Sequence, residues 1–194
     1  AESGNGLHTH FSVLDAVGKN IFCDESQLES AVAGCLQAFE VSTLFFAPYA
    51  NSFERFVIGA HAPTSATWGH ENRTVAIRIP SGPKAATRIE HRVAGGDANP
   101  YLMFAAIFGA ALEGIELRAK PPKPIAGNAY TQPSEMPGLL PNLAAAIRGL
   151  NSPLLVKFIP TMILQNLAAT KTQERYLFER MSDHEALLAL VDTA

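Results

Sequence analysis

Three short segments of this chain alternate polar and apolar side chains with a period of two, and this alternation restricts the possible fold more than any other feature. The segments cover residues 6–14, 73–80 and 87–93. Every second side chain of a strand lies on the same face, so each segment predicts a strand with one apolar and one polar face. The apolar faces must be buried against other parts of the chain. Their positions are Leu7, Phe11, Val13, Val75, Ile77, Ile79, Ile89 and Val93.

The residues between the first two strands have the pattern of helices. Residues 26–40 carry an apolar stripe at helical spacing, and Ser26 is the expected N-cap. Residues 43–58 are apolar and aromatic around Pro48, which predicts a second helix that is broken there. Residues 59–70 contain glycine and proline and predict a loop.

A long helix is predicted over residues 99–116, with Asp97 or Asn99 as its cap and Pro100 in its first turn. Because this segment is apolar nearly all round, we expect the helix to be buried. Further helices are expected over residues 139–192, interrupted at Pro153 and Pro160.

The order of strand, helices, strands and helices predicts an α+β fold, an antiparallel sheet with helices packed on one face. Residues 1–117 would form the sheet and its helices. Residues 118–194 would form a proline-rich connection and the C-terminal helices of the same domain. The connection, residues 118–138, is long for a loop within a compact domain.

Charge and composition exclude several classes of protein. The net charge of −3 argues against a generally basic nucleic-acid binder, and no apolar run is long enough for a transmembrane helix. Residues 1–4 lack the pattern of a signal peptide. Cys23 and Cys35 match no zinc motif and make a disulfide framework improbable, so we expect a cytoplasmic protein without membrane or nucleic-acid partners.

The polar faces of the three strands hold the candidate binding and catalytic side chains. If the strands share one sheet, they place two imidazoles, one carboxylate and several guanidinium groups on one wall. One imidazole and one carboxylate are half of a divalent-metal site, and arginine suits carboxylate and phosphate ligands. The simpler alternatives are solvated histidines and an ion-pair ladder along the third strand. The residues on this wall are His8, His10, Ser12, Arg78, Arg88, Glu90 and Arg92.

Arginines are concentrated around this wall, since residues 55–92 hold six basic and two acidic residues. The chain has no glycine-rich phosphate loop of the Walker or dinucleotide type, and neither Ser12 nor the cysteines have the neighbours of a catalytic nucleophile. A bound nucleotide would therefore be held by arginines on a sheet face rather than at a helix N-terminus.

Several motifs, in order, resemble the glutamine synthetase family. Residues 4–12 read Gly-Asn-Gly-Leu-His-Thr-His-Phe-Ser, similar to the family's Gly-x-Gly-Met-His-x-His-x-Ser strand. Residues 51–57 resemble its Asn-Ser-Tyr-x-Arg-Leu-Val segment, and residues 72–80 its Asn-Arg-Ser-x-x-Ile-Arg-Ile-Pro segment. Residues 88–92 and 98–102 resemble Arg-Ile-Glu-x-Arg and Ala-Asn-Pro-Tyr-Leu.

The resemblance implies an ATP-dependent ligase that joins the γ-carboxylate of glutamate to ammonia or an amine through γ-glutamyl phosphate. It implies that His8 and Glu90 ligate Mg²⁺ or Mn²⁺, and that Arg73 bridges the transferring phosphate and the substrate. Glutamate would be bound by Gly4, Arg55, Arg73 and Arg92. ATP would be bound by His10, Ser12, Arg73, Arg78, Lys84 and Arg88.

One loop indicates which kind of amine the protein uses. Where ammonia-using members read Gly-x-Glu-Ala-Pro, this chain reads Gly-Ala-His-Ala-Pro over residues 59–63. His61 provides no fixed anion for ammonium but can accept a proton from an attacking amine, so it is a candidate catalytic residue. We expect an organic amine, as in the γ-glutamylpolyamine synthetase branch. The alternative is a glutamine synthetase with a divergent loop.

The resemblance also implies that a larger protein surrounds this chain. In the family an N-terminal β-grasp domain and the first half of the catalytic domain precede the His-x-His strand and supply further metal carboxylates. Family members assemble as stacked homo-oligomeric rings. The chain alone would then hold half a site. The alternatives are an inactive family relative with a binding or structural role and an independent anion-binding domain.

Overall fold

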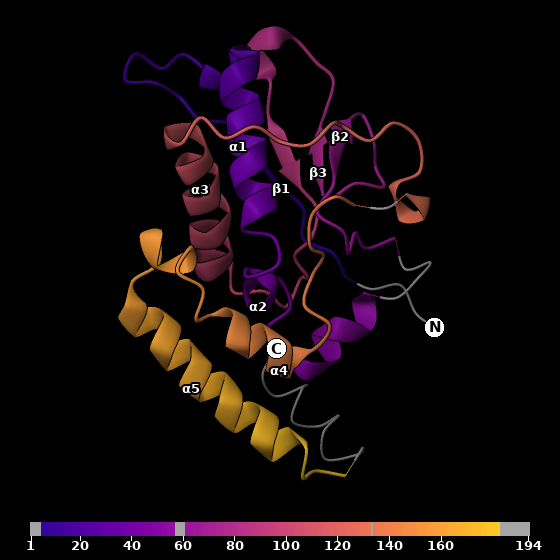
Figure 1. Ribbon diagram of the computed structural model, residues 1–194, viewed down its shortest axis with the longest axis vertical. Coiled ribbons are helices and arrows are strands. Elements are labelled where there is room, and N and C mark those ends of the chain that lie inside the picture. The colour runs from indigo at the N-terminus through magenta and orange to yellow at the C-terminus, as the bar shows by residue number, and fades with distance from the viewer. Residues whose placement is uncertain (1–4, 57–60, 133, 183–194) are drawn as a thin grey trace.

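A central sheet of four short strands organises the chain in the computed structural model, which describes residues 5–56, 61–132 and 134–182 (Figure 1). The strands lie in the order β1 (Thr9–Phe11), β4 (Ile89–His91), β3 (Ile77–Ile79) and β2 (Trp68–His70). The β1–β4 and β4–β3 pairs are antiparallel, as the α+β prediction requires. The three predicted strands therefore share one sheet, although each is only three residues long.

The fourth strand was not predicted, because β2 lies inside the segment expected to be a loop. It pairs in parallel with β3, so the sheet is not antiparallel throughout. Trp68 is buried, and its indole Nε1 donates to the carbonyl of Pro122 at 2.7 Å. The proline-rich connection runs along this edge, where the Ile125 N–H donates to the Trp68 carbonyl. Tertiary contacts, rather than residue alternation, hold this strand.

Two helices pack against the sheet and against each other. Helix α1 (Glu25–Gln37) begins one residue earlier than expected, and its N-cap is Asp24 rather than Ser26. The Asp24 carboxylate accepts from the Ser26 N–H at 2.9 Å. The capping side chain therefore belongs to residue 24, and Ser26 already lies inside the first turn. Helix α3 (Pro100–Glu116) is capped by Asn99, one of the two candidates, and has the expected proline in its first turn.

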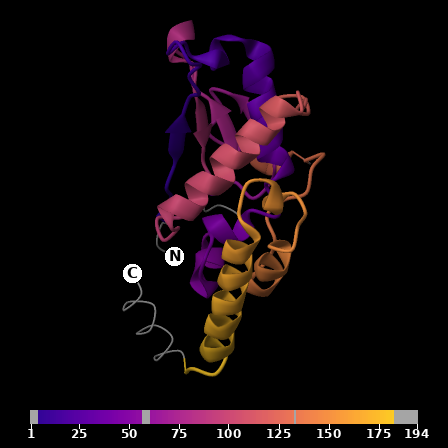
Figure 2. The ribbon, with the colours of Figure 1, turned by 90° about the vertical axis from the view of Figure 1, so that its left-hand side faces the viewer.

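The expectation that α3 is buried all round is wrong. Met103, Ala106, Ile107 and Ala110 are buried, but Tyr101 is 83% and Leu112 47% exposed. Figure 2 shows the cause, since α3 lies on the outside of α1 and the sheet. Only one face of the helix meets these elements, and the chain described here does not cover the other.

The remaining helices lie below the sheet in Figure 1. The predicted broken helix is α2 (Thr43–Phe46) followed by a 3₁₀ turn, η2 (Ala50–Arg55), with Pro48 between them. The C-terminal helices are α4 (Leu143–Gly149) and α5 (Thr161–Phe178), separated by a short turn, η5 (Leu155–Lys157). Further 3₁₀ turns are η1 (Ile21–Cys23), η3 (Lys84–Ala86) and η4 (Ala129–Thr131). No helix in the described ranges is long and apolar enough to cross a membrane.

Candidate functional site

Glu90 is the centre of the polar face of the sheet. Strand register aligns it with His10 of β1 on one side and Arg78 of β3 on the other. Its carboxylate is buried and accepts from Arg78 Nη1 at 2.7 Å and from Arg92 Nη1 at 2.6 Å. Burial acts to raise the pKa of Glu90, but the hydrogen bonds from Arg78 and Arg92 outweigh it and keep the pKa below its usual value. Glu90 is therefore an anion at neutral pH.

Both histidines of the first strand lie beside this carboxylate. His8 Nδ1 is 3.3 Å and His10 Nε2 is 3.8 Å from Glu90 Oε1. Burial and the neighbouring Arg92 lower the pKa of His8 despite the opposing charge of Glu90. His8 is thus neutral at pH 7, the form in which an imidazole binds a metal ion.

The donor set fits part of a divalent-metal site. A neutral imidazole and an ionised carboxylate suit Mg²⁺ or Mn²⁺, which also take oxygen ligands from water and substrate. Within the described ranges, no group of three or more histidine, cysteine or acidic side chains is arranged to hold a metal ion. His8 and Glu90 can supply two ligands, and the others must come from elsewhere.

Guanidinium groups surround Glu90 as the alternation predicts. Arg92 Nη2 donates to the Arg73 carbonyl at 3.0 Å, and Arg88 Nε donates to His10 Nδ1 at 3.4 Å. Arg55 lies near His8, since a Cβ added at Gly6 would be within 4 Å of both side chains, and its Nη2 donates to the carbonyl of Val93. We call these residues the guanidinium cluster. Its members are Arg55, Arg78, Arg88 and Arg92, with His8, His10 and Glu90 between them.

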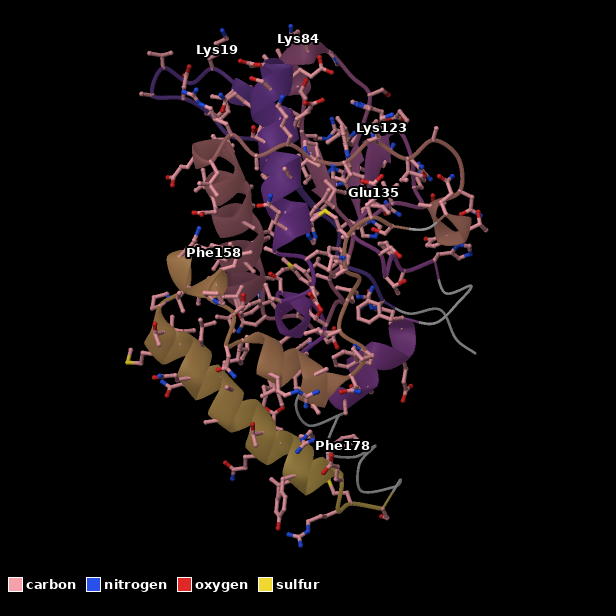
Figure 3. The ribbon with its side chains drawn as sticks, viewed as in Figure 1. Lys19, Lys84, Lys123, Glu135, Phe158 and Phe178 are labelled. Atoms are coloured by element: carbon pink, nitrogen blue, oxygen red, sulfur yellow. The ribbon has the colours of Figure 1, made fainter. Side chains whose placement is uncertain are left out.

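Not every predicted site residue has a contact with this cluster. Arg73 contributes its carbonyl, but its side chain is exposed, and Ser12 is exposed beyond the end of β1. Lys84 lies in η3 at the far end of the molecule, next to Lys19 in Figure 3, and both line a hollow of about 680 Å³. Gly4 lies outside the described residues.

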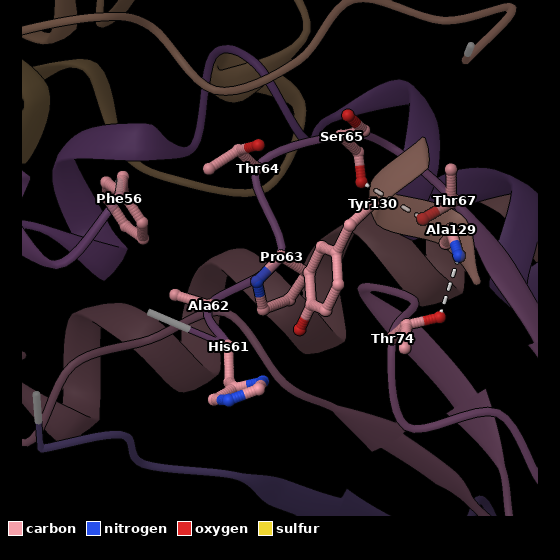
Figure 4. Close-up of a pocket in the computed structure, with 10 residues that line it drawn as sticks. All are labelled: Phe56, His61, Ala62, Pro63, Thr64, Ser65, Thr67, Thr74, Ala129 and Tyr130. Atoms are coloured by element: carbon pink, nitrogen blue, oxygen red, sulfur yellow. Dashed lines mark hydrogen bonds between the residues drawn. The ribbon is translucent and has the colours of Figure 1, made fainter. Parts of the chain in front are cut away.

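His61 lies at a second hollow, shown in Figure 4. Its backbone has a positive φ of 56°, and its ring centroid is 6.4 Å from that of Tyr130. The hollow has a volume of about 120 Å³ and no acidic side chain among its described lining. Burial raises the pKa of Tyr130, and the positive charge of Arg92 acts to lower it. The lining is Phe56, His61, Ala62, Pro63, Thr64, Ser65, Thr67, Thr74, Ala129 and Tyr130.

Two residues of the site were missed by sequence reasoning. Glu71 pairs with Arg78 at 3.2 Å and accepts from the Ser81 N–H, so it holds Arg78 on the side away from Glu90. It has a positive φ of 52° and lies outside the alternating segments, so no periodic signal indicates it. Tyr130 comes from the proline-rich connection, whose sequence has no periodicity at all.

Comparisons with known proteins show which family and fold this chain is similar to. The family model described as "Glutamine synthetase, catalytic domain" matches residues 1–187. The chain is 43% identical over 132 residues to a γ-glutamylethanolamide synthetase of Streptomyces coelicolor, covering 66% of this chain and 28% of the relative. It is 41% identical over 135 residues to a γ-glutamylputrescine synthetase of Escherichia coli, covering 67% and 29%.

A solved structure gives the same result for the fold. The GmaS–ADP complex superimposes with a TM-score of 0.81 and 31% sequence identity, covering 96% of this chain and 46% of that one. The chain therefore spans less than half the length of the proteins it resembles.

Proposed function

Because this chain belongs to the glutamine synthetase catalytic-domain family, we propose that the full-length protein is an ATP-dependent ligase that joins the γ-carboxylate of glutamate to an amine. The observation that carries the proposal is the environment of Glu90. A buried, ionised carboxylate lies in register between His10 and Arg78 and contacts a neutral His8. Such a wall can hold a polyphosphate, a carboxylate and a divalent cation together.

Each residue of the wall has a role in this reaction. His8 and Glu90 would hold Mg²⁺ or Mn²⁺, which supplies charge neutralisation for phosphate when bound. Arg55 and Arg92, with Gly4, would bind glutamate. His10, Ser12, Arg78, Lys84 and Arg88 would bind ATP, and Arg73 would contact both substrates.

The proposed reaction has two steps. A γ-carboxylate oxygen of glutamate attacks the γ-phosphorus of ATP, the bond to the bridging oxygen breaks, and ADP leaves. The amine nitrogen then attacks the carbonyl carbon of γ-glutamyl phosphate, inorganic phosphate leaves, and His61 accepts the proton that the nitrogen loses. The guanidinium groups stabilise the charge that develops on the transferring phosphoryl group.

The amine is proposed to be organic rather than ammonium. His61 occupies the position of the glutamate found in ammonia-using members, and the adjoining hollow of about 120 Å³ has room for a short carbon chain. Relatives named for ethanolamide, putrescine and isopropylamine products or substrates support this assignment.

The test measures phosphate release by the full-length protein with ATP, Mg²⁺ and glutamate. Ammonium is compared with ethanolamine, putrescine and simple alkylamines, and reactions without glutamate serve as controls. We expect an organic amine to give the highest kcat/KM. If ammonium is the best substrate, the organic-amine assignment fails while the ligase assignment stands. If no amine gives glutamate-dependent phosphate release, the ligase assignment fails.

We also propose that the full-length protein is a cytoplasmic homo-oligomer of stacked rings. The uncovered face of α3, where Tyr101 is 83% and Leu112 47% exposed, supports burial against further protein. Light scattering on the purified full-length protein should give the mass of a ring assembly, and a monomeric mass would contradict the proposal.

A further inference from the structure

Lys171 is the only buried lysine in the part of the chain that the structure describes. It lies on α5, where Leu164 is the only other fully buried side chain, and it is 6% exposed. Figure 1 shows α5 alongside α4, below the sheet. The proposed reaction does not use Lys171, so its burial needs another explanation.

The ammonium group of Lys171 has two partners. Its Nζ donates to Glu174 Oε2 at 2.7 Å and lies 4.0 Å from the centroid of the Tyr49 ring. Burying a charged group costs free energy unless partners compensate it, and an apolar side chain would fill this position at lower cost. An apolar side chain could replace neither the ion pair with Glu174 nor the cation–π contact, and the cation–π contact is the one that joins α5 to Tyr49.

Tyr49 in turn begins the turn that carries Arg55. Its N–H donates to Ser52 Oγ at 3.0 Å, and Ser52 Oγ donates to the Asp97 carboxylate. Burial raises the pKa of Tyr49, and the negative charges of Glu174 and Asp97 raise it further. The phenol therefore lies within the fields of both carboxylates, one on α5 and one beside the site.

Arg55 ends the same turn, and its position depends on the same groups. Its Nη2 donates to the Val93 carbonyl, and its Nε and the Asp97 carboxylate both lie against Gly95. Burial lowers the pKa of Arg55, whereas the charge of Asp97 acts to raise it. Lys171 thus contacts Tyr49 at the start of the turn, and the Asp97 carboxylate accepts from Ser52 within it. At the end of the turn, Arg55 donates to the Val93 carbonyl.

We propose that Lys171 is a positioning residue for the glutamate substrate: it holds Tyr49, and through the 50–55 turn it keeps the guanidinium of Arg55 in place beside His8. This inference rests on the proposed function, because Arg55 is the residue that would bind the glutamate carboxylate. It assigns to helix α5 a role in substrate affinity that acts through Tyr49 and the 50–55 turn.

A purely structural lysine would behave differently from a positioning one. Loss of a structural contact lowers the melting temperature and the amount of active protein, but leaves the KM values of the correctly folded fraction unchanged. Loss of a positioning contact weakens ground-state binding of one substrate, so it raises the KM for glutamate with little change in kcat or in the KM for ATP.

The experiment compares variants of the full-length protein by steady-state kinetics and melting temperature. Lys171→Met removes the ammonium at similar volume, and Lys171→Arg keeps a cation over the ring. Tyr49→Leu removes the ring and is better tolerated, because Tyr49 is only half-buried. The matched control is Lys157→Met, which breaks the ion pair between Lys157 of η5 and Glu113 of α3, away from the 50–55 turn.

We expect Lys171→Met and Tyr49→Leu each to raise the KM for glutamate about three- to tenfold, with the KM for ATP and kcat within about twofold of the wild type. The double variant should show no further increase, since both changes break one contact. Lys171→Arg should restore the KM to within about twofold, and Lys157→Met should change nothing.

An unchanged KM for glutamate in both Lys171→Met and Tyr49→Leu overturns the inference, as does an equal rise in the KM for ATP. Because the wild type is assayed alongside, the two failures are distinguishable. Absence of glutamate-dependent turnover in the wild type contradicts the proposed function itself.

Discussion

At the scale of single residues, the two cysteines illustrate how burial sets reactivity. Cys35 is buried between α1 and α3, and burial raises the pKa of its thiol to about 12. Cys23 is partly exposed, and its Sγ donates to the Lys84 carbonyl at 3.2 Å. The thiolate is the reactive form of cysteine, so the burial of Cys35 and the raised pKa of its thiol both protect it from modification.

We therefore expect a maleimide or iodoacetamide reagent to modify Cys23 and spare Cys35 in the native full-length protein at pH 8. Peptide mass spectrometry after labelling checks this, and labelling in urea, where both thiols should react, is the control. Modification of Cys35 at a rate similar to that of Cys23 under native conditions would contradict the packing described here.

Arg73 allows a sharper test of a single side chain in the proposed reaction. Its exposed guanidinium would bridge the transferring phosphoryl group, an interaction made mainly in the transition state. Lysine keeps the charge but not the planar fork. We expect Arg73→Lys to lower kcat about 100-fold while the KM for glutamate changes less.

The matched control for Arg73→Lys is Arg175→Lys, which alters an exposed pair with Glu179 on α5. This change should leave both constants within about twofold. A rise in the KM for glutamate with kcat unchanged in Arg73→Lys would make Arg73 a binding residue only.

At the scale of elements, the crossing of α1 and α3 depends on glycine. A Cβ on Gly34 would lie 2.0 Å from the Ala110 carbonyl oxygen and 2.9 Å from Gly114 Cα. These are backbone atoms that cannot rotate away, so the helices would have to separate. This crossing keeps α1 packed against one face of the sheet, and Glu90 lies on the opposite, polar face.

Gly34→Ala should therefore destabilise the full-length protein by about 1–3 kcal/mol, the cost of overpacking, although alanine is the better helix former. Urea unfolding followed by circular dichroism measures the change. Gln37→Ala, at an exposed position of the same helix, should stay within about 0.5 kcal/mol of the wild type. Equal stability of Gly34→Ala and wild type would show that the helices do not approach this closely.

At the scale of the whole molecule, the chain holds only part of the proposed site. In the proposed site His8 and Glu90 would supply two metal ligands, and the described residues contain no group of three such side chains arranged to hold a metal ion. Divalent cations neutralise the charge of a triphosphate during phosphoryl transfer, and two ligands are too few to hold the cations firmly. We expect the purified 194-residue chain to release no phosphate from ATP in a glutamate-dependent manner.

The same assay with the full-length protein is the positive control, and circular dichroism shows whether the shorter chain is folded. Glutamate-dependent phosphate release by the folded 194-residue chain would show that residues 1–194 contain a complete site.

The sequence by itself determined the sheet face and its chemistry. A period of two places His8, His10, Arg78, Glu90 and Arg92 on one side, because side chains alternate along any strand whatever its neighbours are. It also limited the α3 cap to Asp97 or Asn99 and predicted the break at Pro48, since capping and proline geometry act over a few residues.

Only the tertiary structure decided the features that depend on distant parts of the chain. Strand β2 exists because the connection near Ile125 and strand β3 pair with it, and the outer face of α3 is exposed because no described element covers it. The contact between Lys171 and Tyr49 joins residues more than a hundred positions apart. Local patterns carry no information about such pairs, because their free energy arises only when packing brings the groups together.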